Sequence, residues 1–496
     1  MLRGRWSEAF LLGALWLVAF AAKWPILGVP AYWDEGLHYW TARHLGQAVS
    51  AVTDVWGNPV AAPHYLIFQR PLFYLLFALP AQGGFHSFRV AHAVAASVLA
   101  PLAYLLLRVH GAPRWAGVLA GLAAATVPML VLWGNLGLMD SLMTAGLAVM
   151  LIARATDRPL LLGAAAVATV WTKETAYGAV LLFLLIDLVA GLRDGSVSLW
   201  PLRMGKRLTA LSWAAVLAPL PLVYAMAHDL ALPGAPNHGS AVPLLDMVLL
   251  TPWLLPFIAI GLRVPRIRPL AITSLVSAGF LVALQLAARD VPQWYEVPTT
   301  FFAVVAAIAG AHAAWQARWP WSTLRWAPMM VVAALLVVAV VVPAGAGREI
   351  LRPLTHDAGD SLSGTWNYEL NIRDRDLRDV RAQIPLAQHP DVLAIDLASP
   401  GLFVPIVEEA HHVYADSSFI RTLVPFEVEG LAERIEANGT WTLLDVTDLP
   451  MNQAIVQVYA DCLVYQNPTY DLYVGAPCAG RAARLEAAWR AIDPET

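Results

Sequence analysis

Charged residues are scarce in this chain. They make up 14% of its 496 residues, and the formal net charge is only -4. Lys and Arg are scattered between apolar stretches and form no basic patch, which excludes nucleic acid as a partner. Cysteine is scarcer still, with Cys462 and Cys478 alone, both in the polar C-terminal part. A disulfide between them would stabilise that part by about 3 kcal/mol in an oxidising compartment, and two free buried thiols are the alternative.

Hydrophobic residues are abundant instead. They reach 58% of the chain, and the mean hydropathy is +0.58. Both values lie outside the range of soluble globular domains and predict an α-helical polytopic membrane protein. Tryptophan, with 20 residues, suits a protein that has two membrane interfaces. About eleven apolar runs are candidate spans. They cover residues 9–27, 88–107, 115–133, 141–153, 160–175, 177–191, 208–227, 243–262, 270–288, 298–316 and 326–345.

The basic residues predict which side of the membrane each segment faces, because Lys and Arg gather on the cytoplasmic side. With the N-terminus inside, most basic residues fall in the inner segments. The outer segments then hold only Arg43, Arg70, Arg89, Lys173 and Arg289. A cleavable signal peptide is the alternative interpretation of the first run. Either way, the segment after it lies outside.

A long outer loop, residues 31–87, follows the first run and has two half-apolar pieces, 35–49 and 65–80. The second piece is short for a span and contains Arg70 followed by Pro71. We expect it to form a helix that lies along the membrane rather than across it.

Asp34 and Glu35 form an acidic pair at the start of this loop. Adjacent residues on a helix point about 100° apart, so one carboxylate of the pair would face a common cavity. Asp34 would share its helix face with Leu37, His38 and Thr41. An interfacial amphipathic helix with solvated acids is the alternative.

Unusual polar residues gather on the predicted outer side. Each of them alone is more often structural than functional, because ionisable groups at span ends can reach the interface. Their gathering at one face predicts a site there. They are Asp34, Glu35, His38, His64, Arg70, Asp140, Lys173, Glu174, His228, Asp229, His238, Arg289, Asp290, Tyr295 and Glu296.

The composition becomes water-soluble beyond residue 345. We expect residues 346–496 to form an α/β domain on the outer face. It has no Gly-rich phosphate loop, nucleophile elbow or metal-type Cys/His spacing. The expected strands are 392–397, 441–446, 454–459 and 470–474, and the expected helices are 373–384, 428–437 and 481–492.

Five short motifs occur in order along residues 1–345. They are Trp33-Asp34-Glu35, Gln69-Arg70-Pro71-Leu72, Phe88-Arg89-Val90, Gly137-Leu138-Met139-Asp140-Ser141 and Thr172-Lys173-Glu174. In this order the chain resembles the integral-membrane glycosyltransferases of the C-type (GT-C) fold, in particular the aminoarabinose transferase and protein mannosyltransferase group. The resemblance implies a multi-pass protein of the plasma (inner) membrane with an extracytoplasmic C-terminal domain. It also implies a polyprenyl-phosphate sugar donor and a lipid, glycan or protein acceptor at the outer face.

The basic residues on the outer side suit the reaction that the resemblance implies. Breaking a sugar to lipid-phosphate bond develops negative charge on the phosphate, which fixed cations stabilise. Arg70, Lys173 and Arg289 are available on the outer side, and Arg70 matches the family position that contacts the donor phosphate. Lys173 could instead pair with Glu174. His64 is a further substrate-binding candidate.

The resemblance also assigns the acids and a late tyrosine. Asp34 matches the family's catalytic acid position and would accept a proton from the attacking hydroxyl, and Glu35 and Asp140 are the other catalytic candidates. Asp140 matches a second acidic position, and an N-cap of the following span is the alternative. Tyr295 resembles a family tyrosine that would hydrogen-bond the phosphate. We therefore expect inverting transfer by single displacement.

Two points stay open at this level. Some aminoarabinose transferases have an acidic residue just before the phosphate-binding cation, where this chain has Gln69. No metal ligand is therefore assigned, although a divalent metal cofactor is compatible with the family. The alternative functions are a transporter or flippase of a lipid-linked glycan and a non-catalytic assembly partner. The absence of an internal repeat and the placement of the acids at span ends argue against a transporter.

Overall fold

The structure is a computed structural model of the 496-residue chain. It describes residues 2–24, 27, 34–43, 45, 69–127, 130–131, 134, 136–195, 198–199, 202–203, 205–227, 254–288 and 296–316 of the N-terminal part. In the C-terminal part it describes residues 376, 379–380, 382–383, 391–395, 412–416, 441–445, 456–467, 470–474, 481, 483–484, 487–488 and 491.

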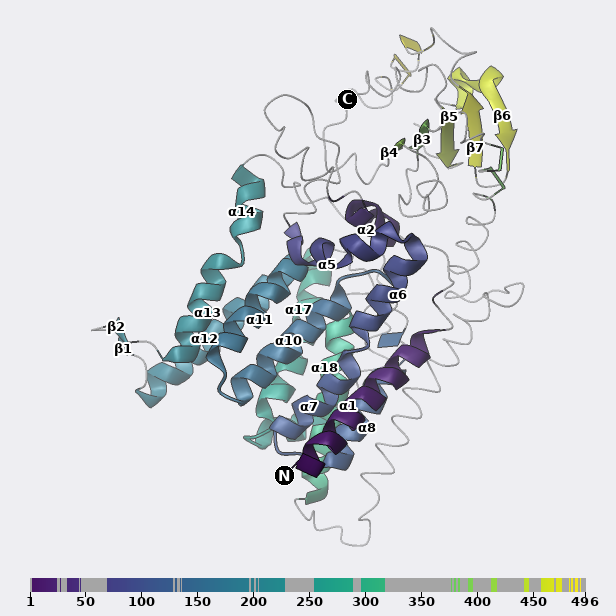
Figure 1. Ribbon diagram of the computed structural model, residues 1–496. Helices are drawn as coiled ribbons and strands as arrows, with labels where there is room; N and C mark the ends of the chain where they lie inside the picture. The colour runs from purple at the N-terminus through teal and green to yellow at the C-terminus, as the bar shows by residue number, and fades with distance from the viewer. Residues whose placement is uncertain are drawn as a thin grey trace.

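Helices of 8 to 22 residues form a bundle in the N-terminal part, with many of them side by side (Figure 1). Their bounds follow the apolar runs of the sequence. They are α1 (Leu2–Lys23), α6 (Phe85–Ala96), α7 (Leu99–Val109), α8 (Arg114–Thr126), α10 (Asp140–Ala155), α11 (Pro159–Thr172), α12 (Tyr177–Asp194), α13 (Lys206–Leu217), α14 (Leu220–Ala227), α16 (Leu255–Arg263), α17 (Arg268–Ala288) and α18 (Glu296–Gln316).

Proline determines two of the breaks between consecutive helices. Pro101 has no N–H to donate to the carbonyl of Ser97, and the helical pattern is interrupted at 97–98, between α6 and α7. Pro219 separates α13 from α14 in the same way. The expected spans 88–107 and 208–227 are therefore interrupted helices.

Four helical segments among the described residues are long and apolar enough to cross a membrane. They are Trp6–Lys23, Phe85–Val109, Glu174–Arg193 and Val297–Gln316. This confirms a multi-pass helical protein. The count of about eleven spans stays a prediction. The expected span 326–345 and part of 243–262 lie outside the described residues.

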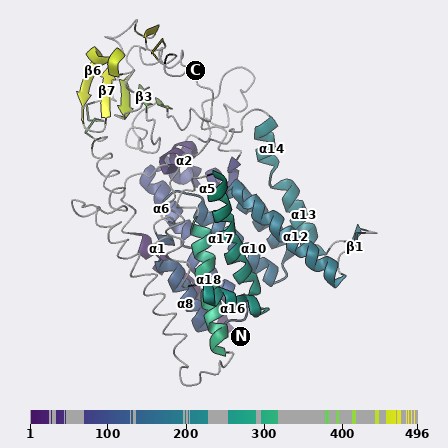
Figure 2. The same cartoon turned by 180° about the vertical axis from the view of Figure 1, so that it is seen from behind.

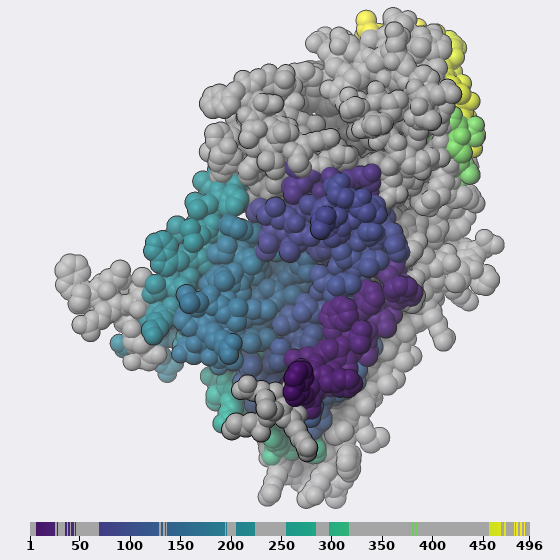
Figure 3. Space-filling model, viewed as in Figure 1, coloured from purple at the N-terminus to yellow at the C-terminus, as the bar shows by residue number. Residues whose placement is uncertain are grey.

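The centre of the bundle is α18, and α1 lies at its edge. The apolar window of α18 is 89% buried, against 17% for that of α1. In the space-filling view α1 lies in purple on the surface of the bundle (Figure 3). Glycines allow the closest helix contacts: a Cβ at Gly310 would lie 1.9 Å from the carbonyl oxygen of Phe257, and one at Gly146 2.1 Å from Thr169 Oγ1. Seen from behind, α16, α17 and α18 lie together on one side (Figure 2).

Two short helices, α2 (Asp34–Arg43) and α5 (Pro71–Gln82), pack together at one end of the bundle (Figure 1). With 12 residues, α5 is too short to cross a membrane. It buries Phe73, Tyr74 and Phe77 but leaves Leu75 and Leu79 63% and 82% exposed. This division into a buried and an exposed apolar face fits the predicted position along the membrane surface.

The C-terminal part contains a five-stranded mixed sheet with the order β4-β3-β5-β7-β6. Its strands are β3 (Asp391–Ile395), β4 (His412–Asp416), β5 (Trp441–Asp445), β6 (Leu463–Gln466) and β7 (Tyr470–Val474). The β3 strand pairs in parallel with β4 and β5, whereas β7 pairs antiparallel with β5 and β6. In Figure 1 the sheet lies beyond the end of the bundle where α2 and α5 lie.

The sheet tests the strand predictions individually. The predicted strands at 392–397, 441–446 and 470–474 are confirmed as β3, β5 and β7, while β4 and β6 were not predicted. The predicted strand 454–459 is wrong at its described residues, because residues 456–458 are helical. Five of the six residues 454–459 are apolar and they do not alternate with polar ones, and periodicity does not separate a strand from a helix over so short a run. The proposed domain boundary at 345 lies outside the described residues.

Of the two alternatives that the sequence left open for the cysteines, the structure has the disulfide. Cys462 is disulfide-bonded, and none of the described residues is a free cysteine. Cys478 is the only other cysteine of the chain. Cys462 is buried and directly precedes β6, so the bond fixes the start of an edge strand.

Candidate functional site

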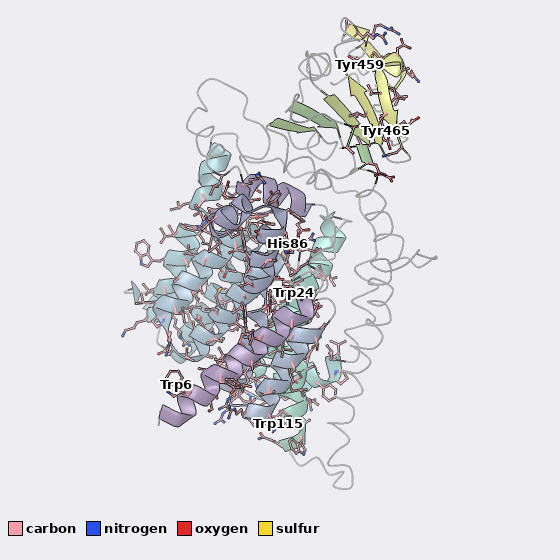
Figure 4. All side chains as sticks on the ribbon, turned by 45° about the vertical axis from the view of Figure 1, so that its right-hand side comes forward. Trp6, Trp24, His86, Trp115, Tyr459 and Tyr465 are labelled. Carbon is pink, nitrogen blue, oxygen red and sulfur yellow. The ribbon has the colours of Figure 1, made fainter. Side chains whose placement is uncertain are left out.

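The five sequence motifs meet at the end of the bundle that α2 and α5 cover. Three ion pairs connect them: Glu35 with Arg89, Asp140 with Lys173, and Arg70 with Glu174. Each pair joins motifs that are far apart in the chain. In Figure 4 His86, which belongs to the first turn of α6, marks this end of the bundle, and Trp6 marks the other.

Glu35 and Arg89 form a fully buried pair. Both side chains are 0% exposed. Arg89 Nε donates to Glu35 Oε1 at 2.8 Å, and Arg89 Nη2 donates to Oε2. The Gly137 N–H also donates to Oε1, at 2.8 Å. A Cβ at residue 137 would lie 2.3 Å from the ring of Phe88, so only glycine allows this approach. Glu35 therefore fixes α2 to α6 and to the segment before α10.

Lys173 and Asp140 form a second pair, just below the surface. Lys173 Nζ donates to Asp140 Oδ1 at 2.6 Å, and the two side chains are 4% and 2% exposed. The alternative of an N-cap at Asp140 is wrong, because Asp140 is the first residue of α10 and the N-cap is Met139, without a side-chain cap. The Asp140 backbone carbonyl accepts a hydrogen bond from Thr144.

Arg70 and Glu174 form the third pair, which is the most accessible. Arg70 Nε and Nη2 donate to the two carboxylate oxygens of Glu174 at 2.9 and 3.0 Å. Their side chains are 16% and 25% exposed. Lys173 therefore pairs with Asp140, whereas its neighbour Glu174 pairs with Arg70. The extended backbone at Lys173, with φ -152° and ψ 121°, turns successive side chains to opposite sides.

His38 lies within the electrostatic reach of these cations. It is buried on α2, and its Nδ1 is 2.8 Å from the hydroxyl oxygen of Tyr74. Burial lowers the pKa of His38 well below its usual value, and the positive charges of Arg70 and Lys173 lower it further. His38 is therefore neutral at physiological pH. Thr41, predicted on the same helix face, is buried as well.

The structure adds residues that the sequence did not assign to the site. Arg89 was counted among the basic residues of the outer segments and was given no role in the site; it is 0% exposed inside α6. Tyr74 and His92 were not considered. His92 Nε2 is 2.6 Å from the carbonyl oxygen of Leu138, which fixes the segment before Asp140 to α6. Phe88, Arg89 and His92 are all buried on α6, and their close spacing in the sequence was the signal that could have placed Arg89 and His92 in the site.

Several candidates lie outside the described residues. His64, Arg289 and Tyr295 are among them. Asp34 begins α2, which places its backbone at this end of the bundle. Within the described ranges, no group of three or more His, Cys, Asp and Glu residues could hold a metal ion.

A bundle of apolar helices, two helices along its surface and a charged cluster beneath them define a multi-pass helical membrane protein. The structure is similar to two crystal structures of ArnT from Cupriavidus metallidurans. The one bound to undecaprenyl phosphate gives a TM-score of 0.58 at 14% sequence identity, covering 95% of this chain and 98% of that chain. The apo structure gives 0.59 at 14% identity, covering 97% and 100%. ArnT is an aminoarabinose transferase of GT-C fold, so this chain has that fold. No protein-family model and no curated protein sequence matches it.

Proposed function

We propose that this chain is a glycosyltransferase that moves a sugar from a polyprenyl-phosphate donor to a lipid, glycan or protein acceptor. One observation carries the proposal: a partly exposed arginine, Arg70, lies at the surface end of a bundle with the fold of ArnT. A solved ArnT structure holds undecaprenyl phosphate. Bidentate Arg groups suit phosphate oxygens, and Arg70 already binds the two oxygens of a carboxylate.

The charges of the site suit a leaving phosphate. An arriving phosphate would compete with Glu174 for the Arg70 guanidinium, and Lys173 lies behind it as a second fixed cation. Because His38 is neutral, it adds a hydrogen-bonding side chain without a further charge. Positive groups fixed before the reaction stabilise the charge that develops when the sugar to phosphate bond breaks.

The proposed step is a single displacement with inversion at the sugar carbon. The acceptor hydroxyl attacks that carbon, Asp34 takes the hydroxyl proton, and the bond to the phosphate oxygen breaks. The electron pair leaves with the polyprenyl phosphate, which Arg70 holds. In this proposal Asp34 is the catalytic acid-base residue. Glu35, which is fully buried against Arg89, positions Asp34 through the start of α2.

We propose that the reaction takes place at the outer face of the plasma membrane and that the C-terminal domain is extracytoplasmic. The disulfide at Cys462 supports an oxidising compartment for the sheet. The basic residues at the opposite helix ends support an inner location for those ends. Periplasmic labelling of a cysteine introduced at the exposed Asp461, in a background with Cys462→Ser and Cys478→Ser, tests the placement directly.

Sugar transfer in proteoliposomes tests the function. Purified protein is given a panel of radiolabelled polyprenyl-phosphate sugars, with Asp34→Asn and Arg70→Ala as the variants. Removing a phosphate-stabilising group of this kind costs about 10²–10³ in rate. The matched controls are Asp157→Asn and Arg263→Ala, two exposed residues outside the three ion pairs of the candidate site. Loss of transfer in the site variants alone supports the proposal. Movement of labelled lipid between leaflets without transfer would replace it with the flippase alternative.

A further inference from the structure

A cavity of about 420 Å³ opens at the end of the bundle away from the three ion pairs. Its polar lining consists of His110, Arg154, Arg207 and Arg266. In Figure 4 Trp115, in the first turn of α8, marks this end, far from His86. The volume falls within the range of small-molecule sites. The proposed transferase site does not use any of these residues.

The three arginines come from separate segments of the chain. Arg154 belongs to the last turn of α10, Arg207 to the first turn of α13, and Arg266 to the turn between α16 and α17. Concentration of Arg at cytoplasmic helix ends explains why such residues occur here. It does not explain why three of them converge on one cavity.

Acidic residues compensate these charges only in part. Arg154 Nε and Nη2 bind Asp187 Oδ1 at 2.9 and 2.8 Å. Arg207 Nε is 3.6 Å from Asp157 Oδ1, and the Asp157 side chain is 82% exposed, so solvent screens this pair. Arg266 has no acidic partner in the described part of the chain. The cavity therefore keeps an excess of positive charge.

Arg266 is exposed, and its side chain lies against the turn after α7. A Cβ at Gly111 would lie 3.6 Å from Arg266 Nη1 and 3.7 Å from its Cδ, so the side chain lies across this glycine. Gly111 has φ +85°, a conformation that favours glycine, in the turn after α7. The turn thus provides a flat surface for the guanidinium and brings it to the cavity wall.

His110 adds a further polar group to the wall. Its ring is 7% exposed, and its Nδ1 is 2.7 Å from the Leu106 carbonyl oxygen. Because a carbonyl only accepts hydrogen bonds, Nδ1 carries the hydrogen. The ring orientation is therefore fixed against α7.

We propose that this cavity binds a phosphate group, carried by an anionic membrane lipid or free in solution. Guanidinium groups bind phosphate oxygens in bidentate geometry, and three of them surround the space. Basic pockets between helices at the cytoplasmic membrane surface are suited to lipid phosphate headgroups. Anions without this geometry, such as chloride, would gain only the general attraction of the charges.

Thermal unfolding of the full chain in phosphatidylcholine nanodiscs tests the proposal. One arm adds inorganic phosphate at constant ionic strength, with sodium chloride as compensation, and the other includes phosphatidic acid in the disc. Binding to the folded state raises Tm with ligand concentration. In Arg266→Gln the half-saturating concentration should increase about tenfold or more, because a charge-assisted contact is lost. Arg263→Gln, an exposed arginine outside the cavity lining, should respond as the wild type does.

The two arms also identify the source of the phosphate group. A rise in Tm with phosphatidic acid alone shows that the site binds a lipid headgroup. Displacement of that lipid by inorganic phosphate shows that the site binds the phosphate group whether or not a lipid carries it. Both results support the proposal. Equal responses of wild type and Arg266→Gln, or no response of the wild type to either ligand, would overturn it. Sugar transfer is not part of this measurement, so its outcome is independent of the proposed transferase function.

Discussion

The buried pair of Glu35 and Arg89 leads to a prediction about stability. Glu35→Gln keeps the shape of the side chain and an oxygen for the Gly137 N–H, but it removes the charge opposite Arg89. Because both side chains are 0% exposed, water cannot compensate the remaining guanidinium. Breaking such a pair costs about 3–5 kcal/mol. We expect Glu35→Gln to lower the free energy of unfolding by an amount in that range.

The double variant Glu35→Gln, Arg89→Met separates charge from packing. It leaves no buried charge, and Met retains much of the apolar stem of Arg. Replacing a buried pair by neutral groups is often close to neutral in stability, so the double variant should be more stable than Glu35→Gln alone. Unfolding in sodium dodecyl sulfate, followed by Trp fluorescence, measures both. A double variant less stable than the single one would refute this account of the pair. Glu35→Gln with wild-type stability and no sugar transfer would instead return Glu35 to the catalytic group.

Three further predictions concern other buried groups. Asp140→Asn leaves the Lys173 ammonium buried without its counter-charge, so the free energy of unfolding should fall by about 3–5 kcal/mol. Adding Lys173→Met to that variant should restore most of the loss. The same detergent unfolding measures both, and an unchanged midpoint in Asp140→Asn argues against the pair. The pKa of His38 in the folded state is well below 6.5, so below pH 6.5 the unfolded state binds more protons. Stability should therefore be complete above that pH and fall as the pH decreases toward the folded-state pKa, by up to about 1.4 kcal/mol per pH unit. His38→Gln should flatten this profile, and a profile unchanged by the substitution assigns the pH dependence to other groups. Cys462→Ser should destabilise the C-terminal sheet by about 3 kcal/mol, and limited proteolysis of the sheet should become faster. A reductant should also make proteolysis of the wild type faster, but it should leave the rate for the variant unchanged.

Local patterns in the sequence predicted much of the fold. Hydropathy located most of the helices, since the energetic demand for about 20 apolar residues in a span is a property of the segment itself. Pro71 after Arg70 marked the start of α5, because proline is favoured at the first helical position. The strand at 470–474 is confirmed as β7 with the same bounds. Short apolar runs were less informative, as the error at 454–459 shows.

The five motifs predicted a site on the outer side, which stays a prediction, and the tertiary structure decided which of their side chains pair. Lys173 and Glu174 are adjacent in sequence, but an extended backbone sends one to Asp140 and the other to Arg70. The sequence placed Arg89 in an outer segment without a partner, and in the structure it is buried against Glu35, which comes from a segment 54 residues away. Hydropathy and spacing act within one segment, whereas the partner of a charge depends on which segments the fold brings within about 3 Å of it.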